Sequence, residues 1–123
     1  MPKIKRVSLT EAEEKLAGLI WREAPLTSPE LVEIAARELD WKKSTTYTIL
    51  KKLCDKSVFK NENAAVTVLL TREEQIARES RGFVEDTFGG SLPRFISAFI
   101  GSGKLTQEQA EEIQRLIDGQ QED

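Results

Sequence analysis

The residues best suited to chemistry in this chain are hydroxyls and lysines gathered between positions 44 and 60. Four small hydroxyl residues and one tyrosine fill positions 44–48, and lysines follow at 51, 52 and 60. Short hydroxyls near a helix start can meet base edges and thymine methyl groups, and lysines can meet phosphates or a guanine edge. We therefore predict a DNA-contacting set made of Ser44, Thr45, Thr46, Tyr47, Thr48, Lys51, Lys52 and Lys60.

The sequence contains few of the residue types that enzymes use for catalysis. The chain contains no histidine, and its single cysteine is Cys54. Histidine is the most common general base and metal ligand, and one cysteine cannot supply a cysteine-rich metal site. The sequence therefore predicts a protein that is not an enzyme, with no metal and no cofactor.

Charge is unevenly distributed along the chain. The formal net charge is −3, yet residues 1–70 carry 12 Lys/Arg against 10 Asp/Glu (+2), while residues 71–123 carry 6 against 11 (−5). Positions 41–60 hold six lysines against Asp55 alone, a local +5. A basic patch on an acidic protein is expected where phosphates bind, although charge alone fits an ordinary solvated helix face equally well.

Length and composition favour a small cytoplasmic protein. The chain has 123 residues, enough for one domain or for a small domain with an appendage. No apolar run reaches the ~20 residues of a membrane span, and no apolar region follows the basic first six residues as in a secretory signal. One cysteine rules out a disulfide framework within the chain, so we expect a reducing compartment and no membrane insertion.

Helix caps and apolar spacing indicate which elements position the predicted contacts. Ser8 and Glu11 have capping-box spacing before a predicted helix over 9–22, and Ser28-Pro29 opens a second over 29–38. Ser44 is the expected cap of a third helix over 45–56. Because a short polar connection joins the second helix to the third, the pattern is that of a helix-turn-helix.

A change of periodicity follows the third predicted helix. Residues 58–60 and 66–70 are β-prone, and the turn-like segment 61–64 separates them. We expect a hairpin wing here. The fold class predicted is mainly α with this small wing, and residues 1–70 form a winged helix-turn-helix DNA-binding domain.

Residues 71–123 are predicted to form a helical dimerisation region. Thr71, Ser91 and Thr106 cap helices expected over 72–88, 92–100 and 107–118, the last ended by Gly119. The apolar side chains exceed what three helices can cover, so we expect a homodimer interface rather than packing against the winged helix. Its predicted residues are Phe83, Phe88, Leu92, Phe95, Ile96, Phe99, Ile100, Ile113, Leu116 and Ile117.

Several segments in order resemble the penicillinase-repressor family from about Leu9 to Leu116. The segments are Leu9–Glu13 with Ile20-Trp21, Lys43–Leu53 followed by Lys56, Phe88–Leu92, and Lys104–Thr106 with Glu108. Two departures are Ser57, where the family often has glycine, and a wing that is less basic than usual.

The resemblance implies a homodimeric repressor that binds dyad operators in double-stranded DNA, upstream of β-lactamase, metalloprotease-sensor or metal-homeostasis genes. It also implies induction by proteolysis before a phenylalanine, with a membrane metalloprotease sensor as partner. The matching bond is Ala98–Phe99, although members with the best-known cleavage have asparagine where this chain has Ala98. Copper-responsive members carry a C-terminal cysteine cluster, which this chain lacks, so copper sensing is not expected.

Two alternative functions are also compatible with the sequence. The net acidity and weakly basic wing are compatible with a winged helix that acts as a protein-interaction adaptor. The phenylalanines of the region 72–100 could also form a pocket for a small ligand that induces the repressor without cleavage.

Overall fold

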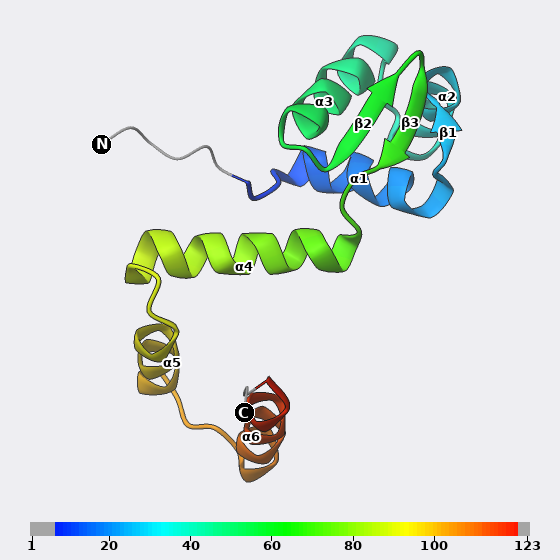
Figure 1. The fold of residues 1–123 in the computed structure, drawn as a ribbon. Coiled ribbons are helices and arrows are strands. Elements are labelled where there is room, and N and C mark those ends of the chain that lie inside the picture. The colour runs from blue at the N-terminus through cyan, green and yellow to red at the C-terminus, as the bar shows by residue number, and fades with distance from the viewer. Residues whose placement is uncertain (1–6, 121–123) are drawn as a thin grey trace. The chain divides into compact units, whose positions relative to one another are not determined.

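A computed structural model describes residues 7–120 of the chain (Figure 1). Its contacts divide the chain into two compact units, residues 1–82 and 83–123, and each is described by itself. The division falls inside a helix, so the first part of that helix packs with the N-terminal unit. The functional division predicted at residues 70 and 71 stays a prediction.

The fold class predicted from the sequence, mainly α with a small wing, is confirmed. In chain order the helices of the described residues are α1 (Glu11–Glu23), α2 (Ser28–Leu39), α3 (Lys43–Asp55), α4 (Arg72–Phe88), α5 (Leu92–Gly101) and α6 (Gln107–Gln120). The strands are β1 (Leu26–Thr27), β2 (Phe59–Glu62) and β3 (Ala65–Val68).

The first two helices begin at capping boxes that differ from the predicted caps. The Thr10 hydroxyl accepts from the Glu13 N–H at 3.2 Å while the Glu13 carboxylate accepts from the Thr10 N–H at 2.9 Å, so α1 begins two residues later than predicted. Thr27 and Glu30 repeat this exchange at α2, which makes Ser28 the first helical residue rather than the cap. Each box satisfies two backbone donors at once, which a single hydroxyl cap cannot do.

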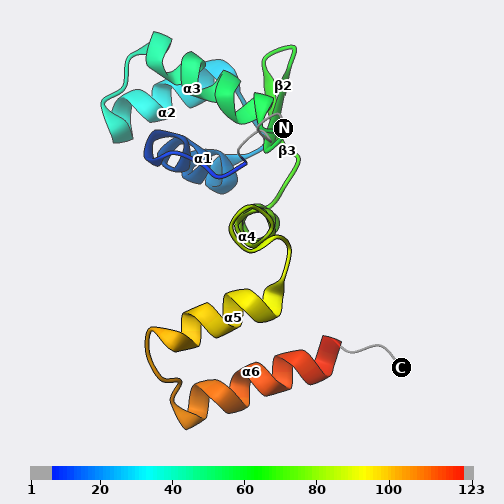
Figure 2. The ribbon, with the colours of Figure 1, turned by 90° about the vertical axis from the view of Figure 1, so that its left-hand side faces the viewer.

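A three-stranded antiparallel sheet lies against one side of α1, α2 and α3 (Figures 1 and 2). β3 is central, paired with β2 through Phe59↔Val68 and with β1 through Leu26↔Val66. β1 was not predicted, because two residues are too few to show an alternating pattern. The wing turn is tighter than predicted, since only residues 63 and 64 separate β2 from β3.

The core of the N-terminal unit fixes the position of α3. Leu50 and Leu53 of α3 are buried in one cluster with Leu16 and Ile20 of α1. Leu31 of α2 and the wing residues Phe59 and Val66 belong to the same cluster. Removing a leucine from such a core costs about 2–5 kcal/mol, so α3 has little freedom to rotate.

In the C-terminal unit, α5 and α6 run in opposite directions (Figure 2). The predicted caps are confirmed, because the Ser91 hydroxyl accepts from the Arg94 N–H and the Thr106 hydroxyl accepts from the Gln109 N–H. The prediction that Gly119 ends α6 is wrong, since the helix continues to Gln120. A glycine in an exposed helix costs only about 1 kcal/mol, which need not terminate it.

Within residues 7–120 no helix has the length and apolar character needed to cross a membrane.

Candidate nucleic-acid interface

The first turn of α3 presents hydroxyls and lysines beside uncapped backbone donors. The helix begins at Lys43 rather than at the predicted Thr45, and its N-cap is Lys42, whose side chain makes no cap hydrogen bond. Ser44 and Thr45 are therefore helical and exposed. Free N–H groups at a helix start attract anions. Lys42 and Lys43, also exposed, extend this character but were not predicted as contacts, although both lie in the basic window.

Thr46 and Tyr47 turn toward the protein. The prediction that Thr46 contacts DNA is wrong, because this residue is fully buried and its hydroxyl donates to the Lys42 carbonyl at 3.2 Å. Tyr47 is partly buried against the core, and its hydroxyl donates to the Ser28 hydroxyl at 3.4 Å. Tyr47 thus connects α3 to the start of α2 and contributes only part of its ring to the surface.

The remaining predicted residues of α3 share an exposed face. Ser44, Thr48 and Lys51 follow one another at spacings of four and three residues, which places them on the same side of the helix. Thr45 and Lys52 lie beside them, and all five are exposed. Lys51 pairs with Asp55 at 3.2 Å, and both side chains are more than half exposed. Such a pair contributes little stability, so a phosphate could replace the carboxylate.

The wing contributes less positive charge than its lysine suggests. Lys60 lies on β2 and pairs with Glu62 at 3.2 Å. Residues two apart on a strand point to the same face, which explains the pairing. Lys60 is exposed as predicted, but its charge is locally neutralised.

Lys56, counted in the basic window, points inward. Its ammonium lies 2.5 Å from the Glu13 carboxylate and also donates to the Ser8 carbonyl at 2.9 Å. Burial opposes ionisation of Glu13, but hydrogen bonds from Lys56 and Thr10 outweigh it and hold the Glu13 pKa below its ordinary value of 4.5. The surface patch therefore consists of Lys42, Lys43, Lys51, Lys52 and Lys60.

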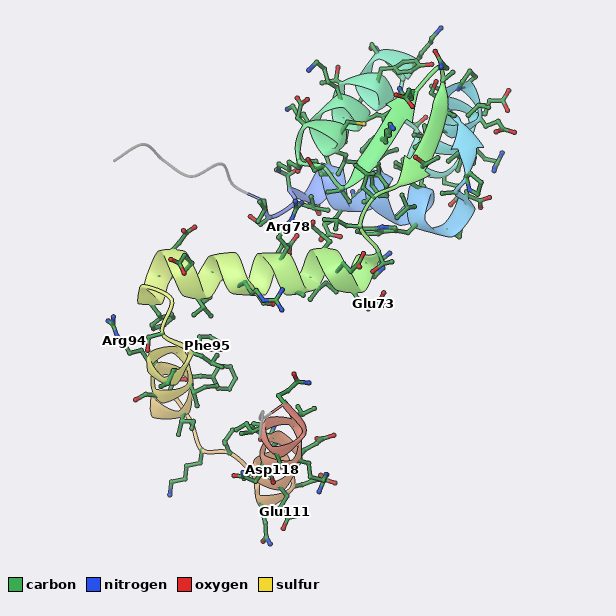
Figure 3. The ribbon with its side chains drawn as sticks, viewed as in Figure 1. Glu73, Arg78, Arg94, Phe95, Glu111 and Asp118 are labelled. Carbon is green, nitrogen blue, oxygen red and sulfur yellow. The ribbon has the colours of Figure 1, made fainter. Side chains whose placement is uncertain are left out.

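The predicted interface residues of the C-terminal unit form an aromatic cluster with an open side. Phe95 lies 5.9 Å from Phe83 and 5.6 Å from Phe88 between ring centroids, and 6.1 Å from Phe99. On α5, Phe95 and Arg94 point to opposite sides (Figure 3). Much apolar surface stays exposed, up to 60% for Phe99 and 67% for Leu116. The exposed members of the predicted set are Phe83, Leu92, Ile96, Phe99, Ile100, Leu116 and Ile117, whereas Phe88, Phe95 and Ile113 are partly buried.

The bond predicted to be cleaved lies inside a helix. Ala98 and Phe99 belong to α5 and are both exposed. A protease needs an extended substrate, so cleavage would require α5 to open locally. Cleavage at this bond stays a prediction.

Three helices, a short α2–α3 connection and a hairpin directly after α3 define a winged helix-turn-helix protein. The penicillinase repressor family matches residues 9–119 of the chain. The penicillinase repressor of Bacillus licheniformis is 20% identical over 122 residues, which cover 96% of this chain and 94% of that protein. The chain belongs to the penicillinase repressor family, as its motifs predicted. It is a transcriptional repressor, and the prediction that it is not an enzyme is confirmed.

Proposed function

We propose that the protein is a homodimeric repressor that binds a dyad operator, with one α3 entering the major groove at each half-site. The observation that carries this proposal is the exposed face of α3. Three hydroxyl residues, Ser44, Thr45 and Thr48, lie beside Lys51 and Lys52 on that face. The hydroxyls are suited to base edges, and the lysines to the flanking phosphates.

The start of α3 adds a second group of phosphate contacts. Lys42 and Lys43 are exposed beside the uncapped backbone donors of the first turn. Lysine ammonium groups and helix N-terminal N–H groups both bind phosphate oxygens. The proposal therefore includes both lysines, which the sequence pattern did not single out.

The apolar surface of the C-terminal unit supports self-association. Leu92, Phe99 and Leu116 are each more than half exposed. Large exposed apolar side chains in this number mark an interaction site. A second copy of the same unit would cover it symmetrically, and the dimer would carry two α3 helices to half-sites about 34 Å apart or a multiple of that spacing.

The test is a fluorescence-anisotropy titration of the full chain against a duplex from the promoter of its own operon, at two salt concentrations. Each phosphate contact adds close to −0.9 to the slope of log affinity against log salt. We expect tight binding that weakens steeply with salt. Binding that is insensitive to salt, or no binding at sub-micromolar protein, contradicts the proposal.

A matched pair of charge reversals separates this function from that of a protein-interaction adaptor. Lys51→Glu with Lys52→Glu places negative charge on the proposed DNA face, and Lys15→Glu with Lys104→Glu makes the same change at exposed positions elsewhere. We expect only the first pair to abolish operator binding and repression. Repression that survives the first pair would favour the adaptor.

Induction by a membrane metalloprotease sensor is the regulatory part of the proposal. Cleavage at Ala98–Phe99 would split α5 and release α6, which leaves the DNA-binding units uncoupled. Treating producing cells with a β-lactam should then yield a fragment that ends at Ala98. Derepression with the chain intact would instead support induction by a small ligand. The proposal places the repressor in the cytoplasm, with access to its operator.

A further inference from the structure

We infer that Arg78 is a positioning residue, which fixes the direction of α4 relative to α3 and so sets the half-site spacing that the dimer accepts. The inference rests on the proposed function. Arg78 lies on the side of α4 that faces the winged helix (Figure 3). One of its terminal nitrogens, Nη2, donates to the Lys56 carbonyl at 2.7 Å, directly after the last residue of α3. The same nitrogen donates to the Gln75 amide oxygen at 2.7 Å.

Gln75 connects this contact to the segment that precedes α1. Its side chain is 1% exposed, and its amide nitrogen donates to the Val7 carbonyl at 2.7 Å and to the Glu79 carboxylate at 2.8 Å. Glu79 also accepts from the Leu9 N–H at 3.2 Å. Gln75, Arg78 and Glu79, which lie one turn apart on α4, therefore contact both the end of α3 and the segment that precedes α1.

The Lys56–Glu13 pair completes the network from the other side. The Lys56 ammonium donates hydrogen bonds to the Glu13 carboxylate of α1 and to the Ser8 carbonyl. The Lys56 backbone carbonyl accepts a hydrogen bond from Arg78. The residue at the end of α3 is thus bound to α1, to the N-terminal segment and to α4. Hydrogen bonds are directional, so a network that connects α4 to the end of α3 is suited to fixing an angle.

A second anchor holds the beginning of α4. The Trp21 indole N–H donates to the Leu70 carbonyl at 2.9 Å, two residues before the helix. The Arg72 guanidinium lies 4.7 Å from the centre of the Trp21 ring. With Arg72 and Arg78 both attached, the first two turns of α4 belong to the winged helix, in agreement with the unit boundary after residue 82.

The anchored helix then continues without a break to Phe88. Ten residues separate Arg78 from Phe88, which is about 15 Å along an α-helix. A tilt of about 10° at Arg78 would displace the far end by about 3 Å. Because that end leads into the proposed dimer interface, a small angular change at Arg78 alters the separation of the two α3 helices without touching their DNA-facing side chains.

The experiment measures spacing discrimination with the full chain. Three duplexes are used: the dyad that the wild-type protein selects from a random-sequence pool, one half of that dyad, and the dyad with ~2 base pairs added at its centre. The insertion turns one half-site by about 70° around the DNA axis and moves it by about 7 Å. The variant is Arg78→Met, which keeps an unbranched apolar side chain but removes the hydrogen bonds to Lys56 and Gln75.

We expect Arg78→Met to weaken binding to the dyad by about 10-fold, or about 1.4 kcal/mol. Half-site affinity should stay within about 2-fold, and the penalty for the longer spacer should shrink. Arg81→Met, an exposed arginine on the same helix, is the matched control and should behave as wild type. Arg78→Lys keeps a cationic donor near the Lys56 carbonyl and should restore part of the discrimination.

Two outcomes would overturn the inference. One is an unchanged spacer penalty in Arg78→Met, and the other is an equal loss on the half-site and the dyad, which would make Arg78 a stabilising residue only. If circular dichroism finds Arg78→Met unfolded, Arg78→Gln, which keeps a polar side chain but removes the guanidinium, is judged by the same two criteria. A wild-type protein with no preference for the dyad over its half would instead refute the proposed function.

Discussion

Several non-glycine residues in and before the wing have a backbone conformation that favours glycine. Ser57, Asn63 and Ala64 have φ values of 64°, 52° and 64°. Asn63 and Ala64 form the two-residue turn between β2 and β3, where hairpins favour Asn-Gly because both residues need positive φ. Ser57 occupies the position where the family often has glycine, so this departure from the family carries a conformational cost.

Ala64→Gly is expected to stabilise the protein. Alanine at positive φ costs about 1–2 kcal/mol, and glycine removes this strain. Glycine in turn destabilises the fold by about 0.5–1 kcal/mol, because its more flexible unfolded chain loses more entropy on folding. We expect a net gain of about 0.5–1 kcal/mol in the free energy of unfolding, measured by urea denaturation. Ala65→Gly, one residue further on in β3, should instead destabilise, and the same sign for both variants would contradict this account of the turn.

Lys52→Ala should weaken operator binding through lost phosphate contacts. Lys52 is exposed on α3, and a dimer presents it twice. We expect similar losses on different operator sequences and a decrease of about 1.8 in the magnitude of the salt slope, measured by anisotropy. Lys15→Ala on α1 is the control. A loss that varies strongly with sequence would show that Lys52 reads a base instead.

At the scale of elements, the sequence predicts most helices well because caps and apolar spacing are local signals. The predicted bounds of α4 agree with the structure, and its start is set by the expected reciprocal box of Thr71 and Glu74. At α3 the cap prediction was wrong, because Lys42 starts the helix without a side-chain acceptor. β1 and the inward direction of Lys56 depend on partners far along the chain, Val66 and Glu13, which no local pattern reveals.

The Glu13–Lys56 contact between α1 and α3 should make stability depend on pH. The folded-state pKa of Glu13 lies below its ordinary value of 4.5, so its ionisation stabilises the fold above that value. This contribution is lost as the pH falls below about 4.5 and through the lowered pKa. We expect thermal unfolding followed by circular dichroism to show this loss in the wild type.

Glu13→Gln should be less stable than wild type at pH 7 by about 3 kcal/mol, because Lys56 loses its partner in a buried pair. The difference should shrink in acid, where the wild-type carboxylate also becomes neutral. Glu14→Gln, exposed on the same helix, should change stability by less than about 0.5 kcal/mol. A Glu13→Gln difference that stays constant across the acid range would contradict this role.

At the scale of the whole molecule, the candidate site could be predicted only in outline. The hydroxyl and lysine content of α3 was visible in the sequence, and its exposed face contains five of the eight predicted contacts. Thr46 was included with them although it shares the helical spacing of Leu50 and Leu53, and that apolar stripe is the signal that places it inward. The paired states of Lys51 and Lys60 depend on the side chains of Asp55 and Glu62.

Phe99→Asp should disrupt the proposed homodimer. Phe99 is 60% exposed on the apolar side of α5, and a carboxylate there would be desolvated by a second copy. We expect sedimentation velocity to show a monomer, with operator affinity reduced to that of a half-site. Ser97→Asp introduces the same charge elsewhere on α5 and should remain dimeric. A Phe99→Asp dimer as stable as wild type would place the interface on other residues.

The proposed function requires two copies of α3 to read one operator in successive major grooves. Hydroxyl-radical footprinting of the wild-type protein on the promoter of its own operon would show whether they do. We predict two protected patches on the same side of the duplex, related by a dyad and about 34 Å apart or a multiple of that spacing. A single patch, patches on opposite sides, or no protection at sub-micromolar protein would contradict the account.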